Sequence, residues 1–134
     1  MPQSLDHIAV VVRDIDEALE FYQDALGLEI VERRMVSNEA VEVASLSMGN
    51  VALELVRPLS GESGVGRFLR KYGEGLHHVC LMVEDIAAAL ARLREAGVDL
   101  INEEPQVAAD GRRYAFVHPR SANGVLLELY EELG

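Results

Sequence analysis

The stretch LDHIAVVV (residues 5–12) returns 71 positions later as LHHVCLMV (residues 76–83). Both runs are apolar, and both carry a histidine at the same place, His7 in the first and His78 in the second. The same shift aligns identical residues further along, such as Asp14 with Asp85 and Leu19 with Leu90. An internal repeat of this kind predicts a fold built from two similar modules.

Each copy predicts the same order of elements. After each DI pair, apolar residues spaced three and four apart predict a helix with one buried face. An aspartate lies at the expected N-cap of each helix, and a glycine lies just past its C-terminal end, where a residue in the left-handed conformation is favoured. These four residues are Asp14 and Gly27 in the first copy, and Asp85 and Gly97 in the second.

Short β-rich runs follow each helix and predict three more strands per module. They are expected at residues 29–36, 41–48 and 51–57, and again at residues 100–102, 113–118 and 125–130. A turn and a short helix (residues 65–72) fill the connection at 59–75. We therefore expect an α+β fold of two paired β-α-β-β-β modules, residues 5–58 and 76–131, in a single domain (1–134).

The overall composition limits the class of protein and the partners that we expect. A chain of 134 residues with 49% hydrophobic and 26% charged residues has the size and balance of a globular domain. Its net charge of −11 argues against a nucleic-acid partner or an anionic membrane surface, because phosphates need a basic footprint. Cys80 is the single cysteine, which excludes an internal disulfide. The N-terminal sequence is unlike a secretory signal, so we expect a cytoplasmic location.

Strand alternation assigns the histidines to a face. Ile8, Val10 and Val12 share one face of the first strand, which we expect to pack under the helices. His7 then points to the other face, and His78 does so in the second copy. His77 falls on the helix side and is the poorer candidate for a site.

The last strand of each module adds a carboxylate to the same face. ALELV (52–56) and LLELY (126–130) place Glu54 and Glu128 between leucines that face the helices. A lone strand histidine or glutamate is usually an ordinary core or surface residue. Two duplicated pairs instead favour a metal site, because a dication offsets the repulsion of two enclosed carboxylates. His7, Glu54, His78 and Glu128 suit Co, Ni, Mn or Zn and leave positions for a substrate.

The paired modules, with a histidine and a glutamate from each, resemble the vicinal-oxygen-chelate or glyoxalase-like superfamily. Three stretches resemble its methylmalonyl-CoA epimerase family in particular: residues 56–79, INEEP (101–105) and FVHPRSANGVLLELYE (116–131). The resemblance implies a cup-like mixed sheet around a divalent metal, with cobalt favoured, and a homodimer. It also implies the four metal ligands above, with Glu42 as a catalytic acid/base and Glu128 as the second such group.

The implied reaction is α-proton abstraction and return on methylmalonyl-CoA, with the enolate stabilised by the metal. If the face that carries Glu42, Ala44 and Leu46 is the cup, burial near an anion would raise the pKa of Glu42 and suit it to proton transfer. Phosphates of coenzyme A would need a local basic cluster. The candidates for it are Arg67, Arg70 and Lys71, or Arg112, Arg113 and Arg120.

Two other functions fit parts of the pattern. A glyoxalase-I-like lactoylglutathione lyase would use the same ligand set on a glutathione hemithioacetal. A non-enzymatic small-molecule-binding module of this fold would need no metal ligands at all. Metal content after purification distinguishes the binding module from both enzymes.

Overall fold

The computed structural model describes residues 2–132, except for the side chain of Gln3. The described residues form two compact units: residues 7–77, and residues 2–6 together with 78–132. Each unit holds one copy of the repeat, and the division at residues 77 and 78 lies close to the predicted start of the second module. The grouping of both modules into one domain stays a prediction.

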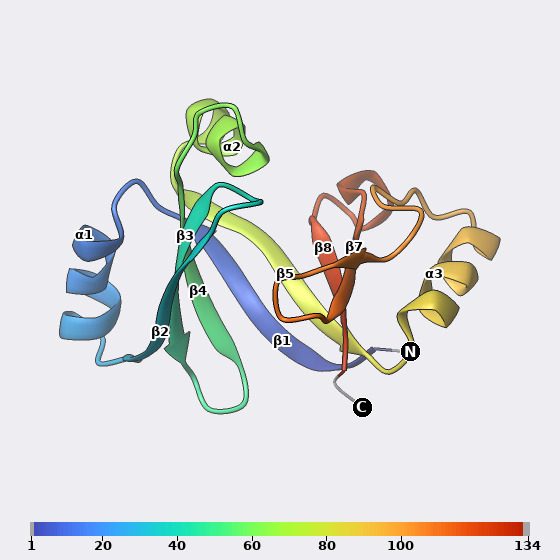
Figure 1. The fold of residues 1–134 in the computed structure, drawn as a ribbon, viewed down its shortest axis with the longest axis horizontal. Coiled ribbons are helices and arrows are strands. Elements are labelled where there is room, and N and C mark those ends of the chain that lie inside the picture. Colours follow the sequence, from blue (N-terminus) through green and yellow to red (C-terminus); the bar gives the residue numbers. More distant parts are fainter. Residues whose placement is uncertain (1, 133–134) are drawn as a thin grey trace. The chain divides into compact units, whose positions relative to one another are not determined.

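The first unit is a four-stranded sheet with helical segments around it (Figure 1). Its elements are β1 (Pro2–Val11, from His7 onward), α1 (Ile15–Leu19), η1 (Glu20–Ala25), β2 (Glu29–Val36), β3 (Val41–Ser47), β4 (Ala52–Pro58) and α2 (Gly64–Tyr72). The strands lie in the order β2-β3-β4-β1. Pairing is antiparallel from β2 to β4, whereas β4 and β1 are parallel.

The second unit repeats this order. Its elements are β5 (Gly75–Val83, from His78 onward), α3 (Ile86–Glu95), β6 (Gln106–Val107), β7 (Arg113–Val117), η2 (Pro119–Ser121) and β8 (Leu127–Glu131). The strands lie in the order β5-β8-β7-β6, with β5 and β8 parallel and the others antiparallel. The predicted α+β class and the β-α-β-β-β order of both modules are confirmed.

The helix caps are placed as the sequence indicates. Asp14 Oδ1 accepts a hydrogen bond from the backbone N–H of Glu17 at 2.9 Å, and Asp85 Oδ1 accepts one from Ala88 at 3.1 Å. Gly27 and Gly97 have φ values of +86° and +80°, the left-handed backbone that ends a helix most easily at glycine.

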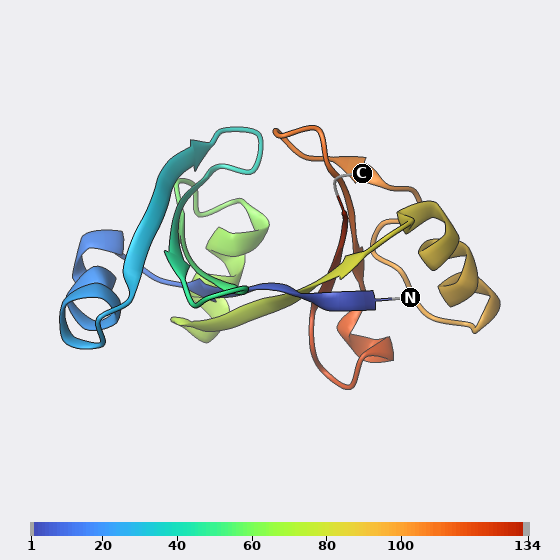
Figure 2. The ribbon, with the colours of Figure 1, turned by 90° about the horizontal axis from the view of Figure 1, so that it is seen from below.

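In both units, one face of the sheet packs under the helix that follows the first strand, as Figure 2 shows for α1 and α3. The alternating residues Ile8, Val10 and Val12 belong to the core under α1, together with Leu53 and Leu55. Leu81, Val83 and Leu129 take the corresponding places under α3. The predicted helix-side face is therefore confirmed, and the histidines and glutamates are left for the opposite face.

Two predicted elements differ from the structure. The first helix widens into a π-helix, η1, in which the N–H of Leu26 bonds the carbonyl of Phe21 at 2.8 Å. The wider turn rotates Leu26 off the buried face, and its side chain is 55% exposed rather than packed in the core. The predicted strand at 100–102 is only a bridge between Leu100 and Val117. Beside that bridge, Asn102 Oδ1 accepts a hydrogen bond from the backbone N–H of Phe116 at 2.8 Å. The side-chain oxygen thus takes the place that a backbone carbonyl would have in a strand.

Among the helices in the described part of the chain, none has the length and apolar character needed to cross a membrane.

Candidate functional site

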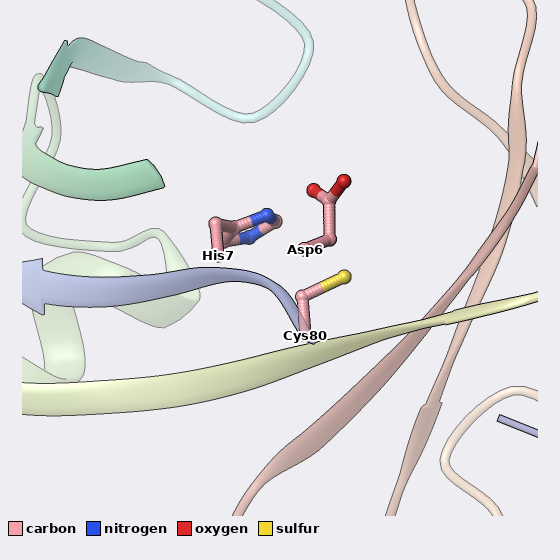
Figure 3. Close-up of side chains that lie close together, drawn as sticks. All are labelled: Asp6, His7 and Cys80. Atoms are coloured by element: carbon pink, nitrogen blue, oxygen red, sulfur yellow. The ribbon is translucent and has the colours of Figure 1, made fainter. Parts of the chain in front are cut away.

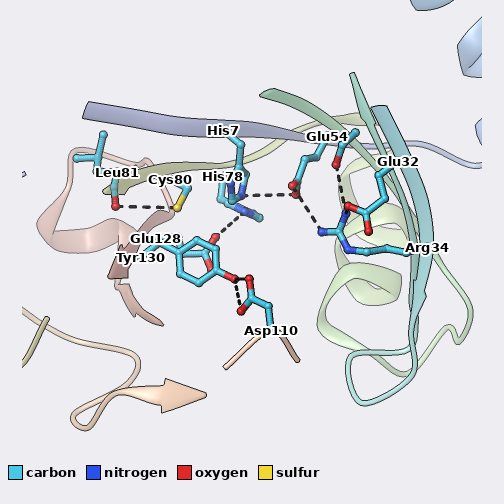
Figure 4. A network of polar contacts seen from close by, with 11 residues as sticks. His7, Glu32, Arg34, Glu54, His78, Cys80, Leu81, Asp110, Glu128 and Tyr130 are labelled. Atoms are coloured by element: carbon cyan, nitrogen blue, oxygen red, sulfur yellow. Dashed lines mark hydrogen bonds and ion pairs between the residues drawn. The ribbon is translucent and has the colours of Figure 1, made fainter. Parts of the chain in front are cut away.

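The first unit places His7 and Glu54 on one face of its sheet. Ala9 of β1 lies opposite Glu54 of the parallel strand β4. His7 is two residues before Ala9, so its side chain is on the same side of the sheet as that of Glu54. His7 Nε2 is 3.6 Å from Glu54 Oε1, and the two side chains are only 6% and 16% exposed (Figure 4). The distance between these two atoms is longer than that of a hydrogen bond.

The second unit repeats this arrangement with His78 and Glu128. Cys80 of β5 lies opposite Glu128 of the parallel strand β8, in the same relation as Ala9 to Glu54. His78 Nε2 is 3.1 Å from Glu128 Oε1 (Figure 4). The imidazole of His78 packs edge-on against the ring of Phe116 at 5.4 Å. The repeat therefore extends to the register of the two parallel strand pairs.

The chemistry of these side chains fits a divalent metal. Each unit supplies one imidazole nitrogen and one carboxylate oxygen, enclosed on the face away from the helix. Imidazole and carboxylate donors together suit borderline dications. Such an ion could be held by residues from two pairs of identical composition, His7 with Glu54 and His78 with Glu128.

Figure 3 draws Asp6 and His7 as successive residues of β1, with Cys80 on β5. Cys80 is fully buried, is not part of a disulfide and lies two residues after His78. Its complete burial suits a packing role. Its Sγ has a weak contact of 4.0 Å with the carbonyl of Leu81 (Figure 4).

Glu42 does not lie with the other candidates. On β3 it is opposite Arg57 and on the same side as Ala44 and Leu46, as predicted, but that side is the helix-covered face of the unit. Ser45 is the β3 residue opposite Glu54. The structure therefore brings His7 and Glu54 together in the first unit and turns Glu42 away from them.

The surroundings of Glu42 also reverse its expected titration. Its Oε2 accepts a hydrogen bond from Arg33 Nε at 2.8 Å and its Oε1 accepts one from Arg57 Nε at 3.0 Å. These guanidinium groups, Arg33 foremost, hold the pKa of Glu42 below its usual value although burial acts in the opposite direction. The expected rise in the pKa of Glu42 is therefore wrong, because the charges nearest to it are cations.

Arg34 is a further residue of this face, which the sequence pattern alone does not indicate. Its Nη1 donates to Ser45 Oγ at 3.2 Å and lies 3.4 Å from Glu32 Oε2, while its Nη2 lies 3.7 Å from Glu54 Oε2 (Figure 4). A β-bulge explains the orientation. Ile30 is opposite Leu46 on the helix side, but two residues later Glu32 is opposite Ser45 on the other side, because the register shifts between them.

The face that carries Glu128 has an arginine as well. Arg112 lies over the ring of Tyr130 at 4.1 Å and its Nε donates to the carbonyl of Glu131 at 3.2 Å. Tyr130 donates its hydroxyl hydrogen to Asp110 at 3.2 Å (Figure 4). Burial, followed by the charge of Asp110, raises the pKa of Tyr130, so the phenol stays protonated.

The residues considered for phosphate binding already have partners within the protein. Arg113 makes two bonds to the Glu131 carboxylate, at 3.0 and 2.9 Å, and Arg120 Nε lies 2.9 Å from Asp99. Arg70 lies 3.8 Å from Glu62. Arg67 donates to the carbonyl of Glu62, and Lys71 lies over the ring of Tyr72. Binding of coenzyme A phosphates by any of these groups stays a prediction.

Comparison with known proteins gives consistent results over nearly the whole chain. Residues 6–116 match the family model described as the Glyoxalase/Bleomycin resistance protein/Dioxygenase superfamily. The uncharacterized protein YqjC of Bacillus subtilis is 41% identical, over 97% of this chain and 93% of that protein. The ethylmalonyl-CoA/methylmalonyl-CoA epimerase of Cereibacter sphaeroides is 38% identical, over 93% of this chain and 95% of that protein. The structure of Streptomyces coelicolor methylmalonyl-CoA epimerase in complex with 2-nitronate-propionyl-CoA matches with a TM-score of 0.91 at 32% identity, over 100% of both chains.

Proposed function

The chain belongs to the methylmalonyl-CoA epimerase family of the glyoxalase/bleomycin resistance protein/dioxygenase superfamily, and on that premise we propose that it interconverts the R and S epimers of methylmalonyl-CoA. The same similarity confirms the glyoxalase-like fold that the sequence predicts. The observation in this chain that carries the proposal is the duplicated histidine–glutamate pair, with the same strand register in each unit.

We propose that His7, Glu54, His78 and Glu128 together bind one divalent metal ion. Two imidazoles and two carboxylates, each enclosed in its own unit, form a donor set suited to such an ion. A bound dication would supply Lewis-acid stabilisation of negative charge on the thioester oxygen. Cobalt is the favoured ion, and a metal assay of the purified protein tests both the presence and the identity of the ion.

We assign the proton transfers to carboxylates on the sheet faces that carry His7 and His78. The α-hydrogen of a methylmalonyl thioester lies between a thioester carbonyl and a carboxylate, so removing it needs only a well-placed base of moderate strength. Inversion requires removal from one face of the acyl group and return to the other. We propose that Glu128 serves one face. Because Glu42 is turned under the helix, we assign the other face to Glu54, which occupies the equivalent register in the first unit.

An isotope experiment tests this assignment directly. Proton NMR of methylmalonyl-CoA in D₂O follows loss of the α-hydrogen, and a chiral assay follows inversion. The metal-loaded wild type should do both well above the non-enzymatic rate. Glu54→Gln and Glu128→Gln should each abolish inversion, while exchange continues for the one epimer that faces the remaining carboxylate. Metal content is measured in parallel, because a variant that has lost its ion reports on binding and not on proton transfer.

The outcome also separates the alternative activities. Wild-type enzyme that exchanges no α-hydrogen above background contradicts the epimerase proposal. Turnover of the glutathione hemithioacetal of methylglyoxal would then identify a lactoylglutathione lyase. A protein that retains no metal and has neither activity would be a binding module.

Two further features complete the proposal. The resemblance favours a homodimer, which analytical ultracentrifugation of the metal-loaded protein tests. A cytoplasmic location agrees with the acyl-CoA substrate, and fractionation of cells that produce the protein tests it.

A further inference from the structure

We propose that Arg34 binds the free carboxylate of a malonyl-type acyl-CoA and so selects against acyl-CoA thioesters that lack this group. The inference rests on the proposed epimerase function and deepens it by naming a specificity residue. Methylmalonyl and ethylmalonyl groups share the carboxylate, so the inference applies to either substrate.

The position of Arg34 is the first argument. Arg34 is opposite Val43 on β3, and the neighbouring positions on this side are Ser45 and Glu54. Its guanidinium therefore lies on the face that carries His7 and Glu54. Of the cationic side chains in the four strands of the first unit, Arg33 and Arg57 bond to Glu42 on the opposite face. Arg34 is the cation that these strands present on the His7 face.

The contacts of Arg34 suit a group that is held in place but can still bind a ligand. Its Nη1 donates to Ser45 Oγ at 3.2 Å and contacts Glu32 at 3.4 Å, which fixes the plane of the guanidinium. Its Nη2 is 3.7 Å from Glu54 Oε2, beyond hydrogen-bond distance. The side chain is 37% exposed. Arg33 provides the contrast, because it makes a 2.6 Å bond to Asp16 and a 2.8 Å bond to Glu42.

The chemistry of the ligand supplies the second argument. A planar guanidinium binds a carboxylate through two parallel N–H donors, which adds geometric selectivity to the charge. The chain has a net charge of −11, so an anionic acyl group needs a local cation in order to bind. The carboxylate of a malonyl-type group is attached to the reacting carbon. A cation beside Glu54 therefore lies where proton transfer is proposed, and it would orient that carbon.

A simpler role for Arg34 would be to hold Glu54 in position. That role predicts an equal loss for every acyl-CoA and a loss of bound metal, whereas carboxylate binding predicts a loss only for ligands that carry the carboxylate. A pair of ligands that differ in this one group separates the two roles. Methylmalonyl-CoA and propionyl-CoA are such a pair.

The experiment is isothermal titration calorimetry of both ligands with cobalt-loaded wild type, Arg34→Gln and Arg34→Lys. The charge-matched control is Arg94→Gln, which changes an exposed arginine of α3. Arg34→Gln should weaken methylmalonyl-CoA binding by at least about 10-fold and change propionyl-CoA binding by less than about twofold. Arg34→Lys, which keeps the charge without the fork, should fall between wild type and Arg34→Gln. Arg94→Gln should match the wild type.

Equal losses for both ligands, or no loss for methylmalonyl-CoA, would overturn the inference. If Arg34→Gln does not fold, Arg34→Lys carries the same comparison. The wild-type α-hydrogen exchange assay is read separately. Absence of exchange contradicts the epimerase function, whereas exchange by the wild type together with unchanged ligand discrimination in the Arg34 variants contradicts only the role of Arg34.

Discussion

Glu42 and Glu54 lie on adjacent strands of one sheet and face opposite sides of it. Glu54 is opposite Ser45 and Ala9, on the face that carries His7, whereas Glu42 is opposite Arg57 beside the core under α1. The two carboxylates thus have different surroundings: Glu54 has an imidazole at 3.6 Å and one guanidinium at 3.7 Å, whereas Glu42 is hydrogen-bonded by two guanidinium groups. We therefore propose a role in the site for Glu54 and a role in the stability of the fold for Glu42.

Replacement of Glu42 by Gln should therefore affect folding more than turnover. The substitution removes the charge that pairs with Arg33 and Arg57, and charged hydrogen bonds of this kind contribute roughly 1.5–3 kcal/mol each. Because an amide retains part of the bonding, we expect the free energy of unfolding to fall by about 1–3 kcal/mol. Urea denaturation measures this change. The α-hydrogen exchange rate at a temperature where the variant is folded should stay within about fivefold of wild type, and a loss of a thousandfold would show that Glu42 is a base after all.

Acid should destabilise the protein through the same residue. The pKa of the folded-state Glu42 lies below its usual value of 4.5, so the carboxylate stabilises the folded state above the unfolded pKa. This stabilisation is lost as the pH falls from about 4.5 through the lowered folded pKa. Glu131 behaves in the same way, because Arg113 and the N–H of Ile86 lower its pKa. Unfolding free energy measured from pH 6 to pH 3 should decline, and Glu42→Gln should make the decline shallower; an unchanged slope would contradict the pairing.

Both histidines should be needed for metal binding, in equal measure. Each of His7 and His78 supplies the imidazole of its own unit, so His7→Ala and His78→Ala should each lower the cobalt retained per chain after dialysis by more than tenfold. His77→Ala is the matched control, because this adjacent histidine packs edge-on against Phe68 at 4.9 Å. It should retain its metal. Equal metal loss in all three variants would point to a general loss of structure, which thermal unfolding would reveal.

The two aspartate caps should make similar contributions to stability. Asp14→Ala and Asp85→Ala each leave helix N–H groups without their side-chain acceptor, at a cost of about 1 kcal/mol in unfolding free energy. Asp→Asn at either position should recover most of that loss because the amide oxygen also accepts. Urea denaturation of the four variants tests this prediction, and a cost below about 0.3 kcal/mol at both positions would refute it.

Much of the candidate site could be predicted from the repeat and from strand alternation. The repeat paired His7 with His78 and Glu54 with Glu128, and alternation placed each of them opposite the leucines and valines of the helix-side core. Those inferences need only the period of a strand. They are local, and the structure agrees with them in both units.

The role of Glu42 could not be derived in this way. Alternation correctly grouped Glu42 with Ala44 and Leu46, but it does not say which face of β3 is covered by a helix. That depends on packing against α1, which lies far from β3 in the sequence. The arginines that lower the pKa of Glu42 come from the neighbouring strands β2 and β4, so the sequence near Glu42 contains no sign of them.

The bulge in β2 decides which of two neighbouring arginines lies on the His7 face. Val31, 68% exposed, is the additional residue between Ile30, on the helix side, and Glu32, on the other side. If the same residues alternated regularly from Ile30 without the bulge, Arg33 would lie on the His7 face and Arg34 on the helix side, so the additional residue is what brings Arg34 to the His7 face. A strand with the same residues but no bulge would present Arg33 in place of Arg34, with every charged side chain still in its sequence. In this strand, the pairing register decides which charged side chain reaches the His7 face, as much as the residue types do.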